Sequence, residues 1–259
     1  MSNGNQDKFI RRVRKALGHS AAEKRSFREL FPQAFDEEQK KTLQKIKSRP
    51  REERETLLQK LIEQGRPLNV NVIPLADNSS VTSAIAGLVE KTIPEWGTSK
   101  SLIAWKHPLI EALNLPDELS KQGVPVYFTS MENGERDKTS KKEELEQIRK
   151  HVIDACIGVT SADFCLAETA SLVMKTRPGQ ARSVSLVPSI HVAVIKLEQI
   201  ISNLKELYTL LGWDAGQKEE GLTNCMTLIT GPSKTGDIEL VIVDGAHGPR
   251  ELYLYVITG

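Results

Sequence analysis

Residues 223–259 read TNCMTLITGPSKTGDIELVIVDGAHGPRELYLYVITG, the stretch with the clearest strand pattern in the chain. Three runs rich in apolar and β-branched residues, CMTLIT, IELVIV and ELYLYVI, predict three strands. The two connections between them, Gly231–Asp237 and Asp244–Arg250, combine glycine and proline with polar side chains, which is typical of turns. Because α/β proteins usually bind ligands at strand ends, both connections are candidate binding loops.

Upstream of this stretch, from Leu68 onward, predicted strands alternate with predicted helices. The strand candidates are NVNVIPL (69–75), SLIAW (101–105) and VPVYFTS (124–130). A long helix is predicted from Ser140 to about Ala155, and a last amphipathic helix from Leu197 to Leu211, with Gly212 just past its end. Such alternation predicts an α/β domain over residues 67–259, built on a largely parallel sheet covered by helices.

The N-terminal part has a different composition. Residues 1–66 are rich in Lys, Arg, Glu and Gln, and helical spacing of apolar residues predicts an N-terminal helical arm that packs on the main domain or on another subunit. Phe9, Ile10, Val13 and Leu17 carry this spacing in the first helix, and further helices are predicted at 36–47 and 52–64. The basic cluster at residues 11–15 is better explained as a solvated helix face than as a nucleic-acid site.

The overall composition excludes several classes of protein. The 259 residues have a formal net charge of +1, which provides no general attraction to nucleic acid. No apolar run approaches the roughly 20 residues that span a bilayer, and the basic N-terminus lacks the apolar core of a signal peptide. We therefore expect a cytoplasmic protein with no membrane span and no nucleic-acid partner.

The cysteines indicate no metal or redox centre within the chain. Cys156, Cys165 and Cys225 have neither CxxC nor Cys/His spacing, and each has apolar neighbours. We expect small core residues, no metal site and no iron–sulfur cluster bound by this chain alone. The identity of any cofactor stays open, since no Gly-x-Gly-x-x-Gly fingerprint is present.

Three motifs occur in a characteristic order: GVTSADFCLAETASLV (158–173), SLVPSIHVAVI (185–195) and GPSKTGDIELVIVDGAHGPRELYLYVI (231–257). Together they resemble the lactate utilization protein C family, the stand-alone LUD-domain proteins. The resemblance implies a three-layer α/β/α sandwich similar to the glucosamine-6-phosphate isomerase/CoA-transferase fold. It also implies a subunit of a bacterial L-lactate utilization system that oxidises L-lactate to pyruvate with iron–sulfur partner proteins. Two positions depart from the family pattern: Ala170, where glycine is usual, and Lys234, where arginine is common.

Three residues are candidates for catalysis. Glu168 could be a general base or a nucleophile, or equally a structural carboxylate that accepts hydrogen bonds from a turn. His247 suits proton transfer near neutral pH. Asp237 points the same way as Glu239 along its predicted strand and could share a proton with it, but a salt bridge to Arg250 or Arg182 is the better explanation for at least one of the two.

Hydroxyls, glycine and cations in the same segments are candidates for binding a small organic acid or another anion. They are Thr160, Thr169, Gly231, Ser233, Lys234, Thr235 and Arg250. His191, inside an apolar strand, is better explained as a core histidine with satisfied hydrogen bonds. Two alternatives to the lactate-oxidation hypothesis stay open: a CoA-transferase- or isomerase-like enzyme acting alone, and a non-catalytic assembly or regulatory subunit.

Overall fold

The computed structural model describes residues 3–18, 36–95, 99–130, 138–221, 223, 225–236, 242–244 and 247–259. The chain divides into two compact units, residues 1–40 and residues 41–259. Helix α1 (Asn3–Ala16) lies in the first unit, and α3 (Glu37–Lys47) crosses the division. Both helices were predicted from the sequence. No helix among the described residues is long and apolar enough to cross a membrane.

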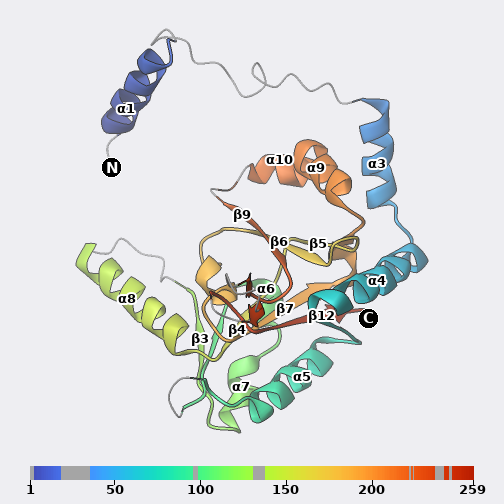
Figure 1. The fold of residues 1–259 in the computed structure, drawn as a ribbon, viewed down its shortest axis with the longest axis vertical. Coiled ribbons are helices and arrows are strands. Elements are labelled where there is room, and N and C mark those ends of the chain that lie inside the picture. Colours follow the sequence, from blue (N-terminus) through green and yellow to red (C-terminus); the bar gives the residue numbers. More distant parts are fainter. Residues whose placement is uncertain are drawn as a thin grey trace. The chain divides into compact units, whose positions relative to one another are not determined.

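A six-stranded parallel sheet forms the centre of the larger unit (Figure 1). In order across the sheet, the strands are β1 (Val70–Leu75), β12 (Glu251–Ile257), β7 (Ile190–Lys196), β4 (Ile157–Thr160), β2 (Leu102–Ala104) and β3 (Val126–Phe128). The strand predicted from ELYLYVI is thus β12, between β1 and β7. All the carboxyl ends lie at one edge of the sheet, which we call the carboxyl edge, and all the amino ends lie at the opposite, amino edge.

Helices cover both faces of this sheet. One face packs against α5 (Asn78–Lys91), α6 (Pro108–Glu111) and α7 (Leu115–Ser120). The other packs against α4 (Arg51–Gly65), α8 (Lys138–Asp154) and a smaller sheet. Alternate residues of β12 enter the two cores, Leu254 on the α4 side and Tyr255 on the α5 side, as a strand buried on both faces requires. The expected three-layer α/β/α arrangement is confirmed.

The smaller sheet consists of β8 (Ile200–Ile201), β5 (Phe164–Leu166), β6 (Ser171–Lys175) and β9 (Met226–Thr230), in that order. The run CMTLIT therefore joins this sheet as β9, rather than pairing with β12. A separate antiparallel pair contains β10 (Lys234–Gly236) and β11 (Ile242–Asp244). Strands adjacent in the sequence of residues 223–259 are thus distributed over three sheets.

The prediction of a single helix from Leu197 to Leu211 is wrong, because the helix begins only at Leu204. This segment forms a 3₁₀ turn (η3, Leu197–Gln199), strand β8, and then α9 (Leu204–Trp213), which continues through Gly212. Asn203 starts α9, because its side chain accepts hydrogen bonds from the N–H groups of Lys205 and Glu206. Before that cap, the backbone of β8 pairs with β5. A further helix, α10 (Ala215–Glu220), was not predicted.

Helix α4, predicted as part of the arm, packs into the core of the larger unit. Its Leu58 and Leu61 are buried beside Val70 of β1, and a 3₁₀ turn (η1, Arg66–Leu68) leads from it into the sheet. The domain boundary expected after residue 66 stays a prediction.

Gly158 allows the segment between β6 and β7 to lie directly against the central sheet. A Cβ atom at this position would lie 1.9 Å from the carbonyl oxygen of Val184, in the 3₁₀ turn η2 (Arg182–Ser185). No side chain can occupy that space. The close approach brings the 176–185 segment over β4 and toward the carboxyl edge.

Candidate functional site

The carboxyl ends of β1, β12 and β7 open into a cavity of about 1040 Å³, which we call the carboxyl-edge crevice. Residues that follow four parallel strands line it: Ala76, Asp77, Asn78 and Ser79 after β1, His107, Pro108 and Leu109 after β2, Lys196, Glu198 and Gln199 at the end of β7, and Ile257 and Gly259 at the end of β12. The first turns of α5 and α6 therefore border it. Ligands of open α/β sheets bind in crevices at this edge, which makes it the leading candidate site.

His107 is the titratable aromatic group of the crevice. Its Nδ1 accepts a hydrogen bond from the N–H of Leu109 at 3.2 Å and so caps α6. Burial lowers the pKa of His107; nearby Arg177 lowers it further, whereas Asp163 and Glu111 raise it. The ring is therefore neutral at neutral pH, and with Nδ1 as the acceptor its proton lies on Nε2. His107 is suited to donate a hydrogen bond to a ligand oxygen.

Charged side chains of both signs line the crevice. Lys196 is exposed at the end of β7, and Glu198 is exposed two residues later. Asp77 is engaged as the N-cap of α5, where hydrogen bonds from Ser80 lower its pKa. Lys196 is thus the lining cation available to a carboxylate ligand.

Gln199 connects the crevice to the loop after β4. Its Oε1 accepts from the backbone N–H of Lys196 at 2.7 Å, and its Nε2 donates to the carbonyl of Ala162. The two strand ends, those of β7 and β4, are therefore held together by one amide side chain.

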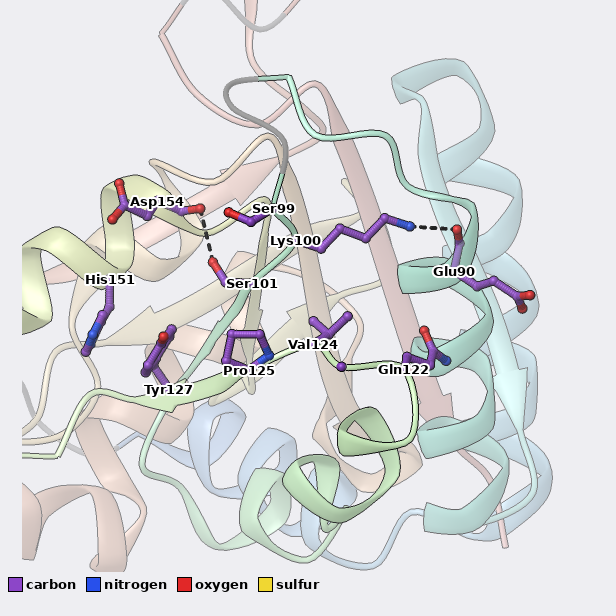
Figure 2. A pocket seen from close by; sticks show the side chains of 11 residues that line it. Glu90, Ser99, Lys100, Ser101, Gln122, Val124, Pro125, Tyr127, His151 and Asp154 are labelled. Carbon is purple, nitrogen blue, oxygen red and sulfur yellow. Dashed lines mark hydrogen bonds between the residues drawn. The ribbon is translucent and has the colours of Figure 1, made fainter.

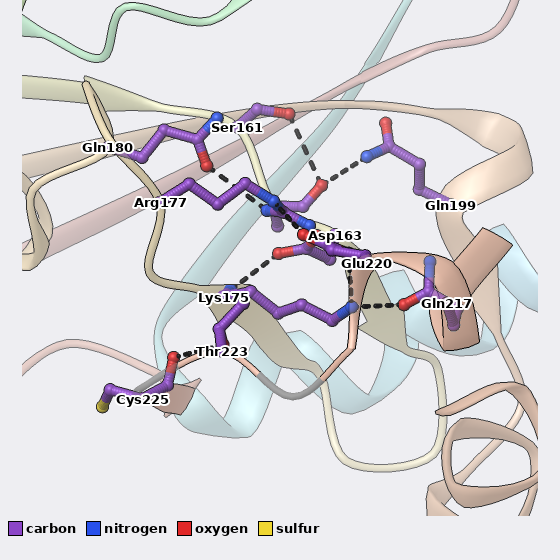
Figure 3. A network of polar contacts seen from close by, with 11 residues as sticks. Ser161, Asp163, Lys175, Arg177, Gln180, Gln199, Gln217, Glu220, Thr223 and Cys225 are labelled. Carbon is purple, nitrogen blue, oxygen red and sulfur yellow. Dashed lines mark hydrogen bonds and ion pairs between the residues drawn. The ribbon is translucent and has the colours of Figure 1, made fainter. Parts of the chain in front are cut away.

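A polar network backs this loop (Figure 3). Asp163 accepts from the backbone N–H of Lys175 at 2.7 Å and from Arg177 Nη2 at 2.5 Å. Lys175, whose side chain is only 3% exposed, pairs with Glu220 at 2.7 Å and also donates to Gln217. Arg177 hydrogen bonds to Glu220 and, with Lys175, lowers the pKa of this carboxyl to about 2. Because each charge is paired, the network is suited to holding the crevice wall in place rather than to reacting.

The segment after Arg177 covers the carboxyl ends of β2 and β3. The carbonyl of Gly179 accepts from the backbone N–H of Lys106 at 2.9 Å and from Thr129 Oγ1 at 2.5 Å. Trp105 Nε1 donates to the carbonyl of Ala181 at 2.8 Å. The crevice therefore lies over β1, β12 and β7.

Thr160, a predicted binding residue, has its hydroxyl engaged inside the fold. It is fully buried at the end of β4, and its Oγ1 lies 2.8 Å from Nε2 of His191. His191 is a core histidine, as expected, but only half satisfied: within the described structure its Nδ1 has no hydrogen-bond partner. Burial lowers the pKa of His191 to about 3.

Glu168 and Thr169 are exposed in the turn between β5 and β6. Glu168 lies 3.7 Å from Lys60 of α4. The hydroxyl of Ser171 hydrogen bonds to the hydroxyl of Thr169 at 2.8 Å and to that of Thr230 at 2.6 Å. This turn therefore lies beside the predicted loop that begins at Gly231. In the same turn, Ala170 has a φ of 46°, a left-handed conformation that favours glycine. The glycine that the family resemblance leads us to expect at this position would adopt this conformation without strain.

The structure brings the two predicted binding loops together, but at the amino edge. The N–H of Ser233 donates to the carbonyl of Pro249 at 2.8 Å. Arg250, just before β12, pairs with Glu95 at 2.5 Å and lines a separate cavity of about 370 Å³.

Of the other predicted residues, Lys234 and His247 are exposed, and Gly231, with a φ of 79°, packs against the carbonyl of Leu68. Asp237 and the side chain of Thr235 lie outside the described residues. None of the predicted site residues that the structure describes lines the carboxyl-edge crevice. Their catalytic and binding roles stay predictions.

Another cavity, of about 660 Å³, lies at the amino edge beside β2 and β3 (Figure 2). In it the Tyr127 and His151 rings stack at 3.7 Å, and Lys100 Nζ donates to the carbonyls of Val89 and Glu90 at the end of α5. These groups already have partners within the fold, so this cavity is a weaker candidate. No group of three or more His, Cys, Asp or Glu side chains in the described parts of the chain could hold a metal ion.

Comparison with known proteins decides the family. Residues 58–257, most of the chain, match the LUD domain. The chain belongs to the LUD domain family.

Several relatives of this LUD-domain chain are named lactate utilization proteins. It is 30% identical over 169 residues to lactate utilization protein C of Halalkalibacterium halodurans, covering 65% of this chain and 67% of that one. With lactate utilization protein C of Bacillus subtilis it shares 26% identity over 97% of this chain and 96% of the relative. A 116-residue segment is 34% identical to lactate utilization protein B of Shouchella clausii, covering 43% of this chain but 22% of that longer protein.

A solved structure supports the fold. The crystal structure of a DUF162 family protein from Deinococcus radiodurans superposes with a TM-score of 0.51 at 19% identity, covering 79% of this chain and 98% of that one. At this identity the similarity establishes the fold of the LUD domain alone.

Sequence reasoning missed the residues of this LUD domain that line the crevice, among them His107, Lys196 and Gln199. A signal was present, because each of them follows a predicted strand within a few residues. Applying the rule for carboxyl ends to the strands predicted before residue 223, and not only to the last three predicted strands, would have identified them.

Proposed function

We propose that this LUD-domain chain acts in lactate utilization, as a subunit of a bacterial system that oxidises L-lactate to pyruvate together with iron–sulfur partner proteins. The observation that carries this proposal is the nearly end-to-end similarity to lactate utilization protein C of Bacillus subtilis. The match to a segment of lactate utilization protein B supports a system in which related domains occur in more than one subunit.

The carboxyl-edge crevice is the proposed site for a small organic acid. Lactate has a carboxylate and a 2-hydroxyl group. Lys196 provides the positive charge that a carboxylate requires, and the neutral His107 provides an Nε2–H donor for an oxygen atom. At about 1040 Å³, the crevice is larger than a three-carbon acid needs, which leaves room for a second reactant.

In the proposed reaction, lactate loses two electrons and two protons to become pyruvate. This chain would bind and orient the acid, the two electrons would pass to the iron–sulfur partner proteins, and the two protons would be released to solvent. The network of Asp163, Arg177 and Glu220 would keep the loops around the crevice in position during this step.

The test is lactate-dependent dye reduction by the chain mixed with its iron–sulfur partner proteins. We expect Lys196→Ala and His107→Gln each to lower this activity by about tenfold or more, as loss of one charged or hydrogen-bonding contact does. Lys121→Ala, which changes the exposed lysine just past the end of α7, is the matched control and should retain activity. Isothermal calorimetry with lactate and pyruvate measures the binding step by itself.

A second set of variants distinguishes the crevice from the loops at the amino edge. Glu168→Gln, Lys234→Ala and His247→Ala change three of the other predicted site residues. Loss of activity in this set, with the crevice variants unaffected, would relocate the site to the loops. Full activity in both sets would overturn a lactate site in this chain and favour a non-catalytic assembly or regulatory subunit.

A CoA-transferase- or isomerase-like enzyme acting alone is the remaining alternative. It would require a reactive carboxylate, and Glu168 is half exposed and close to Lys60 on the surface. A covalent thioester on Glu168 after incubation with an acyl-CoA, seen by mass spectrometry, would favour this alternative over the lactate proposal.

A further inference from the structure

Helix α1 has an apolar face that the described residues of its own unit, residues 1–40, do not cover. Phe9 is 63% exposed, Ile10 38%, Val13 39% and Leu17 67%. At about 100° per residue these positions lie on one side of the helix. The N–H of Leu17 donates to the carbonyl of Val13 at 3.0 Å, so Leu17 continues the helical turn and extends the face. We call these four residues the α1 apolar face.

Cations surround this face. Residues 8–18 contain five basic side chains and no carboxylate, in a chain whose formal net charge is only +1. The five are Lys8, Arg11, Arg12, Arg14 and Lys15. Arg12 and Arg14 flank Val13 in the sequence, and each is rotated by about 100° from it around the helix axis, in opposite directions. The apolar face is therefore bordered by positive charge on both sides.

We propose that α1 lies flat on the surface of an anionic lipid bilayer. Phe9, Val13 and Leu17 enter the boundary between headgroups and acyl chains, and the flanking arginines extend to the lipid phosphates. A helix with a narrow apolar face and a strongly basic polar face has this property. The helix lies on the membrane and does not cross it. This role is independent of the lactate proposal, and it would attach the LUD domain to a membrane surface.

The distribution of charge favours lipid over the other possible occupants. A protein groove that accepted this helix would need carboxylates along both rims, whereas an anionic bilayer supplies negative charge on every side. A second copy of the chain would bring the same basic borders together, and these repel. The apolar face and its cationic borders together fit an anionic membrane.

Vesicle sedimentation of the full chain tests the proposal. At low ionic strength we expect binding to phosphatidylcholine vesicles that contain phosphatidylglycerol, and little binding to pure phosphatidylcholine. The double variants Phe9→Ser with Leu17→Ser, and Arg12→Glu with Arg14→Glu, should each reduce the bound fraction about tenfold or more, because each basic residue and each buried apolar group contributes to such binding.

Matched controls change similar side chains in the other unit. Tyr208→Ser with Leu228→Ser removes exposed apolar groups, and Arg149→Glu with Lys150→Glu reverses exposed charges. Both controls should bind vesicles like the unchanged chain. An unaltered melting temperature of the α1 variants shows that the larger unit stays folded.

A fluorescent label separates insertion of the apolar face from simple attraction of charges. Cys225→Ser removes the half-buried thiol, and Cys156 and Cys165 are buried. An environment-sensitive dye on Val13→Cys should shift to shorter wavelength with anionic vesicles, whereas the same dye on Arg11→Cys should not. No binding to anionic vesicles, or binding that the α1 variants leave unchanged, overturns the proposal. The proposal is also overturned if the unchanged chain does not bind vesicles but self-associates, and the α1 variants lose this self-association. That result would make the α1 apolar face an interface between copies of the chain.

Discussion

The Nζ atom of Lys175 lies 2.7 Å from Oε2 of Glu220, and this ion pair joins β6 to α10, although 45 residues separate the two in the sequence. The lysine side chain is only 3% exposed and the glutamate side chain 27% exposed. Helix α10 is therefore held to β6 of the smaller sheet by a largely buried charge pair.

Removing the acidic partner should destabilise the larger unit. In Glu220→Ala the buried Lys175 side chain keeps Gln217 as its one partner among the described residues, and burying a charge without its counter-ion is costly. We expect the free energy of unfolding to fall by about 1–3 kcal/mol in urea titrations. Glu219→Ala, an exposed neighbour on the same helix, should change it by about 0.5 kcal/mol or less. Equal effects of the two variants would mean that the ion pair contributes nothing.

The same pair predicts a dependence of stability on pH. Hydrogen bonds from Arg177 and Lys175 lower the pKa of Glu220 to about 2, from an ordinary value of 4.5. A carboxyl whose pKa is lowered in the folded state stabilises the fold fully above its unfolded pKa. That stabilisation is lost as pH falls from 4.5 to about 2. Unfolding of Glu220→Gln should therefore depend less on pH across this window than unfolding of the unchanged chain.

Thr160 and His191 form a second buried pair that can be tested. Thr160→Val keeps the shape of the side chain but removes the hydroxyl that hydrogen bonds to Nε2 of His191. In the described structure, Nδ1 of the same ring already lacks a hydrogen-bond partner. We expect the free energy of unfolding to fall by about 1–3 kcal/mol, which is the cost of leaving a buried polar group without a hydrogen bond. Thr209→Val is the control, because among the described residues that buried hydroxyl has the Lys205 carbonyl of its own helix as its one partner. A loss no larger than that of the control would contradict the role of this pair.

Two glycines should respond oppositely to alanine. At Gly158 a methyl group would lie 1.9 Å from the carbonyl oxygen of Val184, so Gly158→Ala should cost about 3 kcal/mol or more, or prevent folding. At Gly87, inside α5, the added Cβ would meet no described atom within 4 Å apart from its chain neighbours and the backbone of its own helix. Gly87→Ala should raise the free energy of unfolding by up to about 1 kcal/mol, because alanine is a better helix former than glycine. Thermal melting of both variants measures the contrast.

His107 should titrate below its usual range, because burial lowers its pKa. A histidine whose pKa is lowered in the folded state stabilises the fold above its unfolded pKa, and that contribution is lost as pH falls below about 6.5. NMR titration of the ring should show this directly. In His107→Ala the free energy of unfolding should fall by about 1 kcal/mol, because α6 loses its N-cap. His107→Asn should retain most of this stability, because asparagine can also cap a helix. An ordinary pKa for the ring would contradict the burial argument.

The alternation of strands and helices after Leu68 was enough to predict the parallel sheet and its covering layers. The apolar, β-branched run of β12 predicted a strand, and the burial of Leu252 and of residues 254–257 fits a position inside the sheet. The segment after Lys196 shows where this reasoning fails. Apolar residues at helical spacing from Leu197 to Leu211 also fit a turn, a two-residue strand and a shorter helix. The cap at Asn203 and the pairing with Cys165 decided between them.

The candidate site was less predictable than the fold. The sequence indicated polar residues at strand ends, but whether a given end lies at the carboxyl or the amino edge depends on strand direction and order. Arg250 precedes β12 and lies at the amino edge, whereas Ile257, at the other end of the same strand, lines the crevice.

The sequence by itself therefore determined the local elements, the two-faced burial of the central strands and membership of the LUD domain family, because these depend on periodicity and on motifs in a fixed order. The tertiary structure alone decided that His107, Lys196 and Gln199 meet at one crevice, and that Lys175 reaches Glu220. Such contacts join segments far apart in the chain. They depend on which strands pair and in which order. The periodicity of side chains within one segment does not determine that pairing.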